Sequence, residues 1–82
     1  MRAMDTSLAA QLESVLRKAA GEGTALTSMT VDYGSEGLAD DLEPKAWVER
    51  ATRSLVFTQG ELRRPDGALA ASASAVFRRA GV

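Results

Sequence analysis

The sequence has 82 residues and a formal net charge of −1, which predicts one domain with no long-range attraction to nucleic acid or anionic membranes. It contains no cysteine and no histidine, so disulfides, thiolate nucleophiles and the Ser-His-Asp and Cys-His mechanisms are excluded. No apolar run approaches the ~20 residues of a membrane span, and no signal peptide is visible. We therefore expect a soluble cytoplasmic protein with neither membrane nor nucleic-acid partners.

Residues 1–20 are predicted to form a helix. Basic residues suit the last turns of such a helix, and Arg17 and Lys18 lie there. Gly21 or Gly23 then supplies the stop. Apolar residues recur at the three- and four-residue spacing of one helical face, namely Leu8, Leu12, Val15, Leu16 and Ala19.

Four strands are predicted to follow the helix. Residues 24–33 are rich in Thr, Val and Tyr, as strands are, and a polar loop with several glycines follows them. Residues 45–52 form the second predicted strand and lead almost directly into the third at 54–63. The fourth strand is expected at 68–78.

The last two strands are predicted to form a hairpin around Arg64-Pro65-Asp66-Gly67. Proline presets φ for the second position of a turn, aspartate can bond its own backbone, and glycine accepts a positive φ. After this turn one strand face is apolar throughout, with small residues in the middle and large ones at the ends. Its members are Leu69, Ala71, Ala73, Ala75 and Phe77. Such a face forms a shallow trough in which a helix can lie close to the sheet.

One helix followed by four antiparallel strands predicts an α+β fold, with the helix packed across one face of the sheet. Four short strands and one helix leave the sheet edges exposed, and exposed edges invite pairing with another chain. We therefore expect a homodimer rather than a marginal monomer with an open edge.

The closing hairpin also resembles a known family. Asp66-Gly67 followed by the strand 69–77 (LAASASAVF) is similar to the end of the hotdog-fold thioesterases, and the order of helix and strands before it is similar too. The resemblance covers about Met4 to Arg79 and looks closest to the branch that includes the phenylacetate-pathway acyl-CoA thioesterases. It implies a helix wrapped by the sheet and a dimer or tetramer whose subunits join through residues 24–33. It also implies an active site for acyl-CoA at the subunit interface, without a metal or redox cofactor.

Two groups of candidate site residues depend on this resemblance. The run 4–9 (MDTSLA) is similar to the family's helix motif and places Asp5 at its acidic position, which implies a general base or a nucleophile. The alternative is that Asp5 is an ordinary charge favouring a helix N-terminus. Arg50 and Arg53 take the place of a basic run in relatives, which implies contact with the phosphates of coenzyme A. The alternative is that both are solvated surface residues.

The resemblance also has departures. Relatives carry a strand and a His-Gly-Gly-type turn before the helix, and that turn supplies the oxyanion donor. Its absence here leads us to expect an N-terminally shortened member. Two hypotheses follow: an acyl-CoA thioesterase with Asp5 as its carboxylate, or a catalytically inactive hotdog dimer that binds acyl-CoA or serves as an interaction scaffold.

Other polar and aromatic residues allow two interpretations each. Tyr33 and Trp47 could line an acyl pocket, but core or interface positions are the commoner role of such aromatics. Asp40, Asp41 and Glu43 could form a metal site, but acidic loops without further ligands are usually solvated, and we expect no metal.

Overall fold

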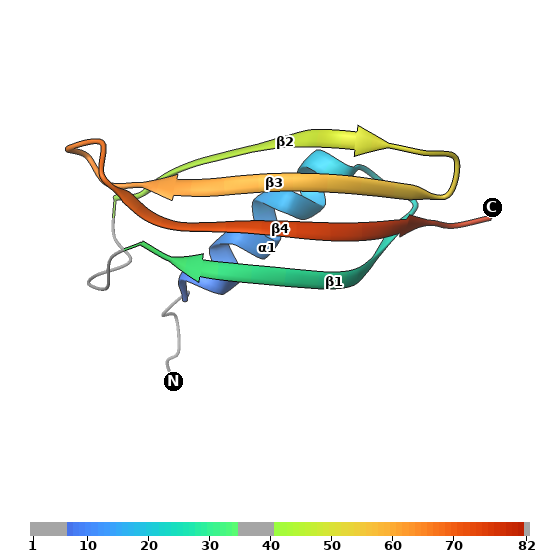
Figure 1. The fold of residues 1–82 in the computed structure, drawn as a ribbon, viewed down its shortest axis with the longest axis horizontal. Helices are drawn as coiled ribbons and strands as arrows, with labels where there is room; N and C mark the ends of the chain where they lie inside the picture. Colours follow the sequence, from blue (N-terminus) through green and yellow to red (C-terminus); the bar gives the residue numbers. More distant parts are fainter. Residues whose placement is uncertain (1–6, 35–40, 82) are drawn as a thin grey trace.

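The protein is one helix packed on one face of a four-stranded antiparallel sheet (Figure 1). The computed structural model describes residues 7–34 and 41–81. The helix α1 spans Leu8–Ala20, and the strands are β1 (Thr24–Tyr33), β2 (Glu43–Ala51), β3 (Leu55–Arg63) and β4 (Leu69–Arg79). The sheet order is β1-β4-β3-β2, so β1 and β2 are the edges. The predicted α+β fold class, with its single helix on a four-stranded sheet, is confirmed.

Helix α1 has a defined cap at each end. Ser7 is extended (φ −65°, ψ 163°), and its hydroxyl oxygen accepts a hydrogen bond from the backbone N–H of Ala10 at 3.1 Å. The helix therefore begins at Leu8, whereas the sequence predicted helix through Ser7; residues 1–6 of that prediction lie outside the described residues. At the other end Gly21 adopts a φ of 92° and donates its N–H to the Arg17 carbonyl at 3.1 Å.

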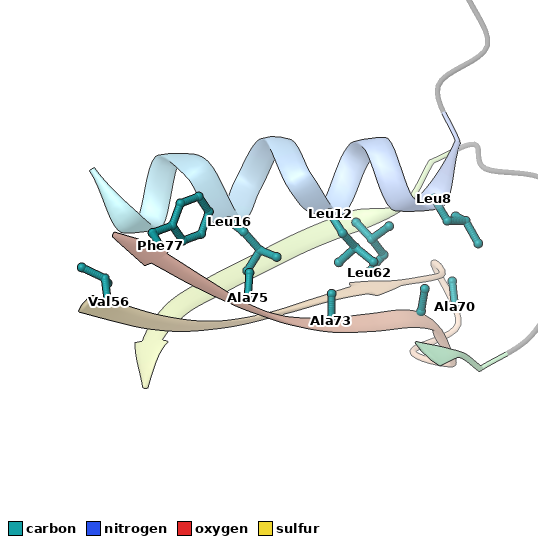
Figure 2. Close-up of a cluster of buried hydrophobic side chains, with 10 residues drawn as sticks. Leu8, Leu12, Leu16, Val56, Leu62, Ala70, Ala73, Ala75 and Phe77 are labelled. Atoms are coloured by element: carbon teal, nitrogen blue, oxygen red, sulfur yellow. The ribbon is translucent and has the colours of Figure 1, made fainter. Parts of the chain in front are cut away.

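The core lies between one stripe of α1 and the facing side of the sheet (Figure 2). Leu8, Leu12 and Leu16 form the helical stripe, and the last two have no exposed surface. Small side chains in the middle of β4 let the helix approach, as the alternation in the sequence predicted. The buried sheet residues are Val56, Leu62, Ala70, Ala71, Ala73, Ala75 and Phe77, together with the polar Thr58, whose hydroxyl donates to the Ala75 carbonyl at 3.2 Å.

The turn between β3 and β4 uses the residues that the sequence indicated. Gly67 has a φ of 92° and donates its N–H to the Arg64 carbonyl at 2.8 Å. The Asp66 carboxylate accepts from the Ala68 N–H at 2.9 Å, and the Arg64 N–H closes the loop on the Ala68 carbonyl. Local hydrogen bonds therefore fix the chain reversal, and with it the register of the two central strands.

One predicted detail of β4 is wrong. The pairing of β3 with β4 shifts between Leu62 and Arg63, so β4 carries an extra residue there. Ala70 is fully buried as a result, and Leu69, which the simple alternation placed on the apolar face, is only partly buried. A period of two residues holds only while the ladder is regular, and this bulge interrupts it.

Candidate functional site

The helix covers the sheet unevenly. It packs mainly over β2 and β3 and touches β1 least. On the helix side of β1, Met29 and Val31 are consequently half-buried against the core, and Tyr33 at the end of the strand is 57% exposed. This strip of β1 is apolar, faces the same side as the helix and runs along an open sheet edge.

The N-terminal end of α1 lies at one end of this strip. Leu8 sits above Ala70 (Figure 2), and the Ala70 carbonyl accepts a hydrogen bond at 2.9 Å from the N–H of Gly34, directly after β1. The first backbone N–H groups of a helix carry partial positive charge, which favours an anion nearby. Asp5 precedes the Ser7 cap by two positions in the sequence but lies outside the described residues, so its predicted catalytic placement stays a prediction.

The two predicted arginines occupy different positions. The register of β2 on β3 shifts between Val48 and Arg50. This bulge turns Arg50 to the face of the sheet that the helix leaves uncovered, where its guanidinium carbon lies 5.8 Å from the ring centroid of Phe57. Arg53 is exposed in the connection between β2 and β3. The structure thus separates Arg50 from the helix side of the sheet, and no ion pair joins Arg53 to any residue within 7–34 or 41–81.

Both candidate pocket aromatics lie at the surface. Trp47 is 38% exposed on β2, and its indole N–H donates to the Glu49 carboxylate at 2.9 Å. This contact holds Glu49 beside Trp47, on the uncovered face with Arg50. Neither Trp47 nor Tyr33 belongs to the buried core of the chain.

A groove of about 380 Å³ on the uncovered face was not predicted from the sequence. It crosses all four strands, with Arg50 and Glu49 on β2 at one side and Ser28 and Thr30 on β1 at the other. The bulge that brings Arg50 into it leaves no mark in the pattern of apolar and polar residues. Only the serines and threonines at alternate positions of β1 and β4 indicated a polar outer face.

Among the described residues, no cluster of three acidic side chains is arranged to hold a metal ion. Of the three acidic residues considered as a metal site in the sequence, Asp40 lies outside the described residues. No helix in the described part of the chain is long and apolar enough to cross a bilayer.

Comparison with known protein families agrees with the fold. The model of the thioesterase superfamily matches residues 1–71, which cover the helix, β1, β2, β3 and the start of β4. The chain therefore belongs to the thioesterase superfamily, and its helix on a four-stranded antiparallel sheet is the hotdog-like arrangement that the sequence predicted. A comparison with curated proteins gives no match.

Proposed function

We propose that this protein hydrolyses acyl-CoA thioesters, with Asp5 as the catalytic carboxylate and a homodimer as the working unit. The observation that carries the proposal is the family match, because it spans Asp5, the helix and the first three strands. The chain contains no histidine or cysteine, so a carboxylate is the strongest candidate base or nucleophile for a thioester.

The two edges of the sheet support a dimer through β1. Both edge strands have a bulge, between Leu26 and Ser28 in β1 and before Arg50 in β2, but β2 also carries Pro44 and several charged side chains, which discourage edge pairing. Strand β1 has ten residues, no proline and a single charge, Asp32. Pairing of β1 with β1 of a second copy would continue the sheet and place the half-buried strip of Met29 and Val31 at the seam between subunits.

This seam would adjoin the N-terminal end of α1, where the acyl group of the substrate would have to bind. The apolar strip of β1 would accept the acyl chain, and the N-terminal end of α1 would favour the developing negative charge of the tetrahedral intermediate. Asp5 would either take a proton from water as that water attacks the carbonyl carbon or attack the carbonyl itself. In both cases the C–S bond breaks, and coenzyme A leaves as its thiol with a proton that comes from water. After direct attack the acyl group would remain on Asp5 as an anhydride, which a second step hydrolyses with water to release the free acid. This reaction needs neither a metal nor a redox cofactor.

Arg53 suits the phosphates of coenzyme A better than Arg50 does. It is exposed in the short connection after β2, at the end of the sheet opposite to the N-terminal end of α1 (Figure 1), and a guanidinium binds phosphate through two parallel hydrogen bonds. Arg50 faces away from the helix and lies over Phe57.

The test is thiol release from short-chain, long-chain and aryl acyl-CoAs, measured for the unmutated chain, Asp5→Asn and the matched control Glu22→Gln. Glu22 is an exposed carboxylate just after α1, far along the sequence from Asp5. We expect Asp5→Asn to lower kcat by about 100-fold or more, as loss of a catalytic acid or base does, and Glu22→Gln to retain it.

Equal turnover by the unmutated chain and Asp5→Asn would remove Asp5 from the mechanism. A folded chain that binds acyl-CoA without turnover would instead establish the second hypothesis, an inactive hotdog dimer acting as a binder or scaffold.

A further inference from the structure

The groove on the uncovered face is built from two neighbouring rows of cross-strand partners. In the first row Arg50 pairs with Phe57, Phe57 with Val76, and Val76 with Ser28. The second row runs from Trp47 through Gln59 and Ser74 to Thr30, again one residue per strand. Side chains of directly opposed residues are about 5 Å apart, so each row forms a continuous line across the sheet.

The β2 side of the groove is formed by long side chains that have partners on the same face. The bulge in β2 sets Glu49 and Arg50 on the same face, and each has a partner there. Trp47 donates to Glu49 at 2.9 Å, and the Arg50 guanidinium lies 5.8 Å from the Phe57 ring centroid. No residue within 7–34 or 41–81 accepts a hydrogen bond from the Arg50 guanidinium, so its N–H groups face the groove or solvent.

The side formed by β1 and β4 has short, polar side chains. Ser28, Thr30 and Ser74 present short hydroxyl side chains from β1 and β4, beside the larger Phe57 and Val76. The hollow between the two sides measures about 380 Å³, which falls in the range of small-molecule sites. It therefore combines an apolar wall, a cation and several hydroxyl groups within one concave surface.

Cations gather at the Arg50 end of the groove, whereas Asp32 and Glu61 lie on the same face beyond its other end. Arg78 lies two residues beyond Val76 on β4, so it shares the uncovered face with Arg50. Glu49 offsets one of these two charges, and its hydrogen bond from the Trp47 indole leaves a net charge of about +1 at this end of the groove. A guanidinium offers paired N–H groups that match the two oxygens of a carboxylate.

We propose that this groove binds a small aromatic carboxylate. The ring packs against Val76 and the edge of Phe57, the carboxylate bonds to Arg50, and the hydroxyls of Ser28, Thr30 and Ser74 face the remaining polar atoms. The site lies on the side of the sheet opposite to the helix, so it is separate from the proposed hydrolytic centre and does not depend on it.

A second copy of the chain fits this face less well. Two sheets pack face to face when both inner faces are apolar and their side chains interdigitate. Here the apolar residues are confined to a patch formed by Trp47, Leu55, Phe57 and Val76, and charged pairs such as Lys45 opposite Glu61 flank it on β2 and β3. Two copies would also close over the polar hollow without filling it.

The test is an NMR titration of the full chain, following assigned backbone amide signals. The probe is benzoate, and the matched ligands are benzamide, which keeps the ring without the charge, and acetate, which keeps the carboxylate without the ring. We expect saturable shifts at Phe57, Gln59, Ser74 and Val76 with benzoate, and binding at least about 10-fold weaker with the other two. Equal binding of all three, or shifts confined to the helix side, would overturn the proposal.

Three variants sharpen the titration. Arg50→Gln removes the cation, and Ser74→Leu fills the hollow at an exposed position where folding tolerates the change; each is expected to weaken benzoate binding about 10-fold or more. Arg53→Gln, an equal loss of charge outside the groove, should change it less than about 2-fold. A comparable loss in Arg53→Gln would contradict a specific site.

Sedimentation velocity tests whether a second copy of the chain, rather than a small ligand, occupies the groove. If Arg50→Gln and Ser74→Leu lower the oligomeric state while benzoate shifts no signal on this face, the groove is an interface between copies, and the proposal is overturned.

Discussion

Gly60 of β3 lies directly beneath Leu16 of α1: a Cβ at Gly60 would come 3.0 Å from Leu16 Cδ2. The Lys45 carbonyl oxygen would lie 3.4 Å from the same Cβ, so backbone as well as a side chain limits the space there. Gly60 is buried and pairs with Ala73, another small residue, on the neighbouring strand. The absent and small side chains at these two positions allow the helix to lie close to the sheet.

Gly60→Val is therefore expected to destabilise the protein by about 2 kcal/mol, because a larger side chain forces Leu16 and the helix away from the sheet. The measurement is urea denaturation at one protein concentration, since dimerisation makes stability depend on concentration. Ser72→Val, on β4 but outside the core, is the control and should stay within about 0.5 kcal/mol of the unmutated chain. Equal effects of the two substitutions would show that the helix has room to move at Gly60.

The cap of α1 supports a second prediction. The Ser7 hydroxyl oxygen accepts from the Ala10 N–H at 3.1 Å, and α1 has no acidic residue in its first turn to share the role. Ser7→Ala should lower stability by about 1 kcal/mol, which corresponds to a fall in Tm of roughly 5 °C for a domain of this size.

Two further substitutions control for the loss of a hydroxyl group and for the cap itself. Ser14→Ala removes the same group from an exposed helix interior, where alanine is the better helix former, and should not lower the Tm. Ser7→Asp keeps an acceptor at the cap and should retain stability. A Tm for Ser7→Ala equal to that of the unmutated chain would mean that water replaces the cap at no cost.

The sequence predicted most of this fold because its local signals agree with the final structure. The turn at Asp66-Gly67 and the small residues of β4 each favour the same hairpin, and the leucine stripe of α1 matches the trough that they form. Three details were not predictable from alternation: the bulges in β1, β2 and β4. The bulge before Arg50 matters most, because it decides which face of the sheet the arginine serves. Bulges are set by the pairing of two strands, and one strand's pattern does not encode that pairing.

The candidate site was less predictable than the fold. The apolar strip of β1 was visible as a strand, but its exposure depends on where the helix crosses the sheet, which is a tertiary property. The groove near Phe57 likewise requires residues from all four strands to meet in two rows. Asp5 remains a prediction from the family resemblance.

The proposed dimer gives the last prediction, and the two edge strands provide a matched pair of substitutions. Val31 on β1 pairs with Ala73, and Val48 on β2 pairs with Thr58; both face the helix side of the sheet from an edge strand. Val31→Lys places like charges at the proposed β1 seam and should weaken the dimer about 100-fold, whereas Val48→Lys should leave it intact. Sedimentation velocity over a range of concentrations measures the dissociation of both variants, and circular dichroism checks that each variant is folded.

Dissociation caused by Val48→Lys alone would place the dimer interface at β2, and a monomeric unmutated chain would contradict a dimeric working unit. Because Met29 and Val31 would line the acyl-binding strip, a folded monomeric Val31→Lys should also lose turnover, which ties the oligomeric state to the chemistry.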